Sequence, residues 1–137
     1  MDAEELSAEI ALKSQQLKDS INNLIEGQED IQHDILELQM RKREGQTIDE
    51  ALLAELKESR NETSEQISML AMMRTELFDD LPVIRVASGK IKVITEELNK
   101  DAKLIETTAK RIQDATKAIG KAEKFLVNII KLAAKIP

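Results

Sequence analysis

Apolar residues in the last third of the chain recur at alternating spacings of three and four, and this repeat limits the fold more than any other feature. Several d residues of the repeat are small, including Ala115 and Ala122. A sustained heptad is the seam of a coiled coil, and small seam residues let helices approach closely. The same spacing recurs over residues 10–38 and 52–77, so the sequence predicts helices throughout and no strands. With Ile84 as the first a residue, the a positions hold Ile84, Ile91, Leu98, Ile105, Ile112, Ile119, Leu126 and Ala133.

The composition supports long helices and excludes several kinds of chemistry. Aromatic residues make up 1 % of the chain and charged residues 34 %, which is typical of helical rods rather than β-sandwiches, barrels or doubly wound sheets. The chain has no cysteine, which excludes disulfides and thiolate metal sites, and His33 is its only histidine. We therefore expect no metal, no cofactor and no small-molecule substrate. No catalytic constellation is present, and the protein is predicted not to be an enzyme.

Two local patterns mark the first turn between helices. Gly45 is suited to the left-handed residue that follows a helix, so the first helix is predicted over about residues 3–43. Thr47 and Glu50 form a capping box, which places the start of the second helix at about residue 48.

A second turn is expected at the acidic, proline-containing run 79–82. Acidic caps and a proline in the first turn favour the start of a helix. The second helix is therefore predicted over about 48–79 and the third over about 82–136. Whether the third helix is continuous or breaks at Gly89 or Gly120 stays open.

These elements predict an all-α fold with one domain over residues 1–137. It is an elongated antiparallel three-helix coiled-coil bundle with a long, protruding C-terminal helix. Because the turns are short and the third helix is the longest, about twenty residues are expected to extend past the first turn without an intrachain neighbour. Exposed apolar faces of this width mark interaction sites. The residues expected to form that interface are Ile119, Ala122, Phe125, Leu126, Ile129, Ile130, Leu132 and Ile136.

Three coverings of this apolar face stay open. A second copy or another helical protein packs on it, the segment folds back at Gly120 onto its own bundle, or it lies on a membrane surface between flanking lysines. We expect first a non-enzymatic helical protein–protein interaction module (an adaptor, regulator or assembly component) that self-associates through this face as a homo-oligomer. The alternative is a membrane-active or lipid-surface-binding helical protein that uses the cationic amphipathic C-terminal segment.

The same turns predict a polar layer inside the bundle. Counting outward from them puts Arg60 beside Asp101, with Gln32 and Gln28 close by. An Arg60–Asp101 ion pair supported by a glutamine amide is therefore expected. Such a layer either sets the register of the helices or forms a pocket for a small polar ligand, and the first interpretation is favoured.

Charge is distributed unevenly along the chain. Residues 1–40 carry ten acidic and two basic side chains (−8), whereas residues 82–137 carry six acidic and twelve basic ones (+6). This asymmetry favours packing of acidic on basic segments, within or between chains. The basic residues from Lys100 to Lys124 have no aromatic residues between them, so no nucleic-acid partner is expected. The acidic N-terminus does not resemble a secretory signal, and a cytoplasmic location, or translocation without a signal peptide, is expected.

Overall fold

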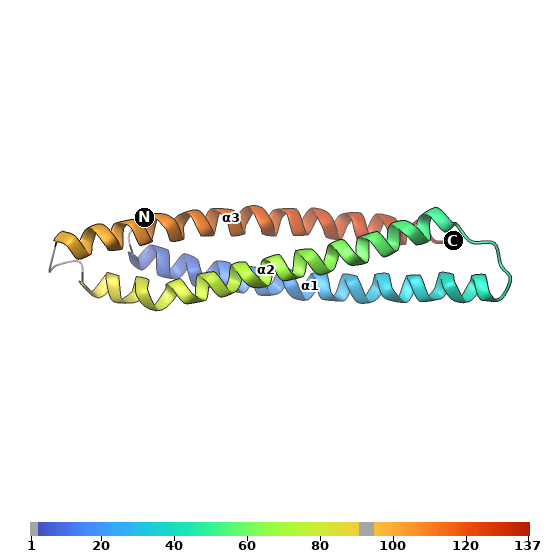
Figure 1. Cartoon of the computed structure of the whole chain (residues 1–137), viewed down its shortest axis with the longest axis horizontal. Coiled ribbons are helices and arrows are strands. Elements are labelled where there is room, and N and C mark those ends of the chain that lie inside the picture. The colour runs from blue at the N-terminus through green and yellow to red at the C-terminus, as the bar shows by residue number, and fades with distance from the viewer. Residues whose placement is uncertain (1–2, 91–94) are drawn as a thin grey trace.

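Three long helices pack side by side along their lengths. The computed structural model describes residues 3–90 and 95–137, with side chains described at 4–81 and 102–137. The helices are α1 (Ala3–Arg43), α2 (Glu50–Lys90) and α3 (Thr95–Ala133). In this elongated bundle α2 runs antiparallel to α1 and α3 (Figure 1). Since the described residues include no strand, the predicted all-α three-helix bundle is confirmed.

The end of α1 forms as its sequence predicts. Gly45 has a positive φ of 83°. The amide of Gln46 donates to the Arg41 carbonyl (3.0 Å), and the amide of Gly45 donates to the Lys42 carbonyl (3.1 Å). These two bonds are a Schellman motif, whose left-handed residue is usually glycine because it has no Cβ.

The residue that caps α2 differs from the predicted one. The amide of Leu52 donates to Oδ1 of Asp49 at 3.0 Å, so Asp49 is the N-cap rather than Thr47. Aspartate is as good a cap as threonine or better, and it moves the helix start to Glu50.

The predicted end of the second helix at 79–82 is wrong. Helix α2 continues through Pro82 to Lys90. A proline inside a helix removes one backbone hydrogen bond, at a cost of about 3 kcal/mol. The residues before it anchor the helix: Leu77 is 1 % exposed, and Leu81 packs against the core. Burial of a leucine contributes roughly 1.5–3 kcal/mol, so the two together offset the proline.

The expected protruding C-terminal helix is consequently also wrong. The three helices have 41, 41 and 39 residues, and α3 begins at Thr95 rather than at 82. The end of the chain lies level with the α1–α2 turn, where Arg41 donates to the Pro137 carbonyl (3.3 and 3.4 Å). Helix α3 is unbroken at Gly120. Residues 91–94, which follow α2, lie outside the described residues.

The described core consists of two apolar clusters, one after the other along the bundle. The larger cluster includes Leu6, Ile10, Leu17, Leu24, Leu70, Leu77, Ile112, Ala115, Ala118 and Ala122. The smaller cluster, next to the α1–α2 turn, includes Ile31, Ile35, Leu38, Leu52, Leu53, Leu56 and Ile129. On α1 and α2, residues 27–28 and 59–66 lie between the two clusters, and much of this interval is polar.

Candidate functional site

The apolar face predicted as an outside interface packs against the chain's own helices. Only Ile130 among the eight predicted residues is exposed, with 67 % of its surface accessible. The reason for the difference is the late start of α3, which keeps the segment beside α1 and α2. The other seven are either buried (Ala122, Ile129) or partly buried against the two clusters (Ile119, Phe125, Leu126, Leu132, Ile136).

Gly27 lets α3 lie close against α1 at this level. A Cβ placed on Gly27 would be 3.3 Å from Cδ2 of Leu126 and 3.4 Å from Cδ1 of Ile129. The first distance is tighter than an ordinary van der Waals contact, so a side chain at this position would force the end of Leu126, or α3 with it, to shift by a few tenths of an ångström. Gly27 is therefore part of the reason that the C-terminal apolar face closes onto its own bundle.

Three of the four residues of the predicted polar layer come together between the two clusters. Arg60 Nη1 donates to Oε1 of Gln32 (2.9 Å). Gln28 Nε2 donates to the Arg60 carbonyl (3.2 Å) and to Oγ of Ser64. The side chains of Gln28, Gln32 and Arg60 thus join α1 to α2 through hydrogen bonds. Nearby on α2, the buried Oε1 of Gln66 has no hydrogen-bond partner among the described residues.

The side chain of the fourth residue, Asp101, lies outside the described residues. The pairing of α2 with α3 nevertheless separates it from Arg60, because Asp80 contacts Thr108. Arg60 precedes Asp80 on α2, and Asp101 precedes Thr108 on the antiparallel α3, so the two are roughly 40 Å apart at about 1.5 Å per residue. The Arg60–Asp101 ion pair was expected because the turn was placed at 79–82, and since α2 continues past that run, the expected pair is also wrong.

A second polar layer, toward the opposite end of the bundle, was not predicted. Asp80 is 7 % exposed, and its Oδ2 accepts hydrogen bonds from Thr108 Oγ1 (3.2 Å) and Arg111 Nη1 (2.5 Å). The hydrogen bond to Asp80 raises the pKa of Arg111, and the charges of Asp80 and Glu76 add to this effect. Asp80 was expected to be a helix cap. Asp80 follows Leu77 by three residues, and this spacing was the sequence pattern that could have indicated that Asp80 faces the core side of α2.

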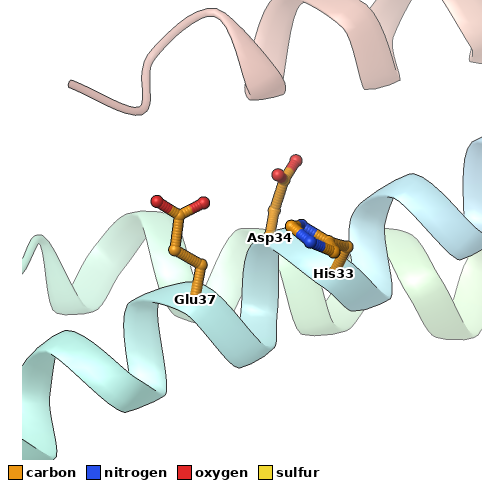
Figure 2. A group of neighbouring side chains, drawn as sticks. All are labelled: His33, Asp34 and Glu37. Atoms are coloured by element: carbon orange, nitrogen blue, oxygen red, sulfur yellow. The ribbon is translucent and has the colours of Figure 1, made fainter.

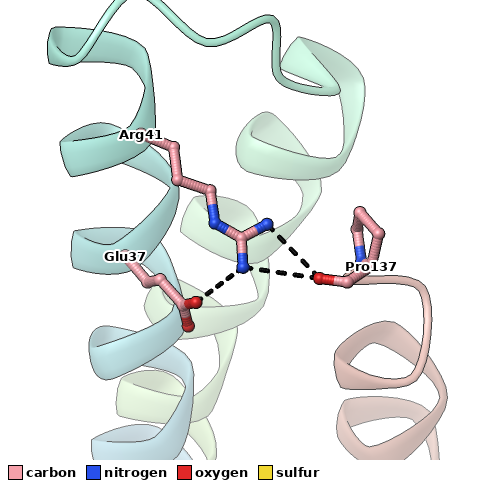
Figure 3. A network of polar contacts seen from close by, with 3 residues as sticks. All are labelled: Glu37, Arg41 and Pro137. Atoms are coloured by element: carbon pink, nitrogen blue, oxygen red, sulfur yellow. Dashed lines mark hydrogen bonds and ion pairs between the residues drawn. The ribbon is translucent and has the colours of Figure 1, made fainter.

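His33, Asp34 and Glu37 gather on one surface of α1 (Figure 2). Their potential ligand atoms lie within 4.8 Å of one another. However, Glu37 Oε1 already accepts a hydrogen bond from Arg41 at 2.7 Å, and the same guanidinium donates to the Pro137 carbonyl (Figure 3). Since protein zinc sites use three or four protein ligands, we assign Glu37 to this contact with the end of the chain and not to a metal.

Asp34 supplies a prediction about pH. Burial raises the pKa of its carboxyl above 3.8, and the charges of Glu37 and Asp30 add to the rise while His33 opposes it. Because the folded chain then binds this proton more tightly than the unfolded chain, ionisation costs stability as the pH rises above 3.8. At a dilution where the chain is monomeric, we expect Asp34→Asn to raise Tm at pH 7 by about 1 °C, since the site is partly solvated. Thermal unfolding followed by circular dichroism should show the difference closing below pH 3.8, and a gain that persists at pH 3 would contradict the prediction.

Two outward apolar residues of α3 form the most accessible part of the predicted interface. Val127 is 50 % exposed and Ile130 67 %, and their spacing of three puts them on the same side of the helix. Lys124 and Lys131 flank them in the sequence. We call Val127 and Ile130 the 127/130 patch. Among the described side chains, the other large exposed apolar residues lie on α1 and α2, where Leu36 and Met40 also share one side of their helix: Leu12, Ile25, Leu36, Met40, Met72 and Phe78.

Comparisons with known proteins add no family to this description. The chain matches no protein-family model, and no similar protein was found among curated sequences or solved structures. None of the described helical residues form a helix that is both long and apolar enough to cross a membrane.

Proposed function

We propose that the protein is a non-enzymatic helical interaction module that contacts its partner through the 127/130 patch of α3. The observation that supports this proposal is the outward position of two large apolar side chains on a helix whose other apolar residues mostly face the core. Exposed apolar side chains between charged ones are typical of contact surfaces between helices.

The polar groups inside the bundle fit a structural role better than catalysis. Arg60 and Gln28 bond across α1 and α2, and Arg111 with Thr108 bonds to Asp80 across α2 and α3. Each of these groups joins two helices, so the chain's own hydrogen bonds hold it in place. We therefore propose that the protein acts by binding and not by chemistry.

Binding to a lipid surface is less well supported. An interfacial helix must turn a broad apolar face to the bilayer. Here Leu126 and Ile129 pack beside Gly27 of α1, and the outward part of the segment is the small 127/130 patch. Lipid binding through the whole segment would require α3 to leave the bundle.

Site-specific photo-crosslinking tests the proposal. A benzophenone amino acid is placed at Ile130 or, as the control, at Met72, which is 59 % exposed on α2. We expect position 130 to give a discrete crosslinked adduct. Excess unlabelled chain should abolish this adduct, whereas excess unlabelled chain carrying Ile130→Asp should not. Equal labelling at positions 130 and 72, or competition by the Ile130→Asp chain, would overturn the proposal.

A further inference from the structure

Unpaired charges of opposite sign lie on the neighbouring outer surfaces of α1 and α3. Residues 19–37 of α1 carry six acidic side chains and no lysine or arginine, whereas residues 117–135, in α3 and just after it, carry five lysines and one glutamate. The two ion pairs that these side chains make among the described residues are Glu37–Arg41 and Lys135–Glu55. The other acidic groups of α1 and lysines of α3 have no ion-pair partner in the described part of the chain. The residues without an ion-pair partner are Asp19, Glu26, Glu29, Asp30 and Asp34 on the acidic side and Lys117, Lys121, Lys124 and Lys131 on the basic side.

The two charged surfaces border the same groove. Asn23 of α1 and Glu123 of α3 line one hollow between these helices. One heptad further along, the corresponding positions are Asp30 and Ile130. Beyond the end of α3, Arg41 of α1 donates to the Pro137 carbonyl (Figure 3). The groove is thus bordered by carboxylates on its α1 side and by the 127/130 patch with its lysines on its α3 side.

The two surfaces are also level with each other along the rod. Helices α1 and α3 run parallel (Figure 1), Gly27 lies beside Leu126 and Ile129, and Arg41 reaches Pro137. A residue of α1 therefore lies at about the height of the α3 residue numbered 96–102 higher. By this count Asp34 is level with Lys131.

We infer that the 127/130 patch docks onto a second copy of this chain in a symmetric dimer, with the α1–α3 side of each copy facing the other. A two-fold axis parallel to the rods puts α1 of each copy against α3 of the other without changing height. The acidic surface of α1 then meets the lysines of α3 twice, and the two 127/130 patches are covered between them. This inference rests on the proposed function and names its partner.

Charge complementarity favours a second copy over an anionic partner. The carboxylates of Asp30 and Asp34 border the groove beside Ile130, and they would repel a phosphate-rich membrane or a nucleic acid placed over the patch. A second copy offers each surface its complement. Because the apolar part is small and the charges are solvent-accessible, the dimer should weaken with added salt.

Charge reversal and sedimentation equilibrium of the full chain test the contact. Asp34→Lys alone, or Lys131→Glu alone, converts both symmetric contacts to like charges, and each should weaken dimerisation about tenfold. The Asp34→Lys/Lys131→Glu double variant restores two opposite-charge contacts and should recover the dimer. An equimolar mixture of the two single variants should also associate, because each chain then complements the other.

Matched reversals on other faces serve as controls. Glu65 lies on α2, and Lys57 lines a groove between α1 and α2. Neither Glu65→Lys nor Lys57→Glu should therefore change the association constant of the dimer. A chain that is monomeric at low salt, or a double variant that stays as weak as the single ones, would overturn the inference. Pelleting of a monomeric chain with phosphatidylserine vesicles would show lipid as the occupant instead. If the dimer is absent but position 130 crosslinks to another protein, and excess unlabelled chain prevents that crosslink, the proposed function still holds and only the inferred partner is wrong.

Discussion

Ile129→Asp is expected to destabilise the bundle severely, whereas Ile130→Asp, one residue further on, should leave its stability nearly unchanged. Ile129 is 5 % exposed in the smaller apolar cluster, and Ile130 is 67 % exposed. The first substitution removes a buried side chain and places a carboxylate in apolar surroundings, which we expect to cost about 4 kcal/mol or more. The second is a surface change, worth about 0.5 kcal/mol or less.

Thermal and urea unfolding, followed by circular dichroism at 222 nm and at a dilution where the chain is monomeric, measures both effects. A loss of about 4 kcal/mol corresponds to a fall in Tm of roughly 15 °C for a domain of this size. A protruding C-terminal helix would make the two variants equally stable. Equal stability, or a larger loss for Ile130→Asp, would therefore contradict the packing of α3 described above.

Arg111→Met is expected to cost about 2 kcal/mol. It leaves the carboxylate of Asp80 without its cationic partner, and the side chain of Asp80, taken without its backbone, is only 10 % exposed. Loss of one member of a fully buried pair costs about 3–5 kcal/mol. The side chain of Arg111 is 38 % exposed, so water replaces part of the lost interaction and lowers the cost.

A double-mutant cycle separates the interaction from the loss of packing. In Asp80→Leu/Arg111→Met both charges are absent, and we expect the double variant to be more stable than the sum of the two single losses by about 1–2 kcal/mol. Lys110→Met, an exposed neighbour on α3, is the matched control and should stay within about 0.5 kcal/mol of the unchanged chain. Strict additivity of Asp80→Leu and Arg111→Met would mean that the pair makes no net contribution.

The sequence predicted the kind of fold because its heptad repeat requires helices to bury one face. It also predicted the first turn, where Gly45 supplies a left-handed residue and few other residues can. The second turn could not be placed in the same way. The run 79–82 carries both an acidic cap and a proline, but those local preferences are worth a few kcal/mol, and burial of Leu77 and Leu81 on the α2 seam outweighs them.

The displaced turn explains which site residues could be predicted. Gln28, Gln32 and Arg60 pair across the first turn, whose position was nearly right, so their approach was predicted correctly. Contacts with α3 depend on the second turn. An error of about a dozen residues there misassigned the partner of Arg60, hid the contact of Asp80 with Arg111, and turned packed core residues of α3 into an apparent outside surface.

Three helices of matched length have one geometric consequence for whatever is attached to them. Because the number of passes is odd, the chain enters at one end of the rod and leaves toward the other, as its two termini do in Figure 1. Helices of 39 to 41 residues at about 1.5 Å per residue would hold two attached groups roughly 60 Å apart. A hairpin of two such helices, or a bundle of four, would bring the same groups together, so this molecule has the geometry of a molecular spacer.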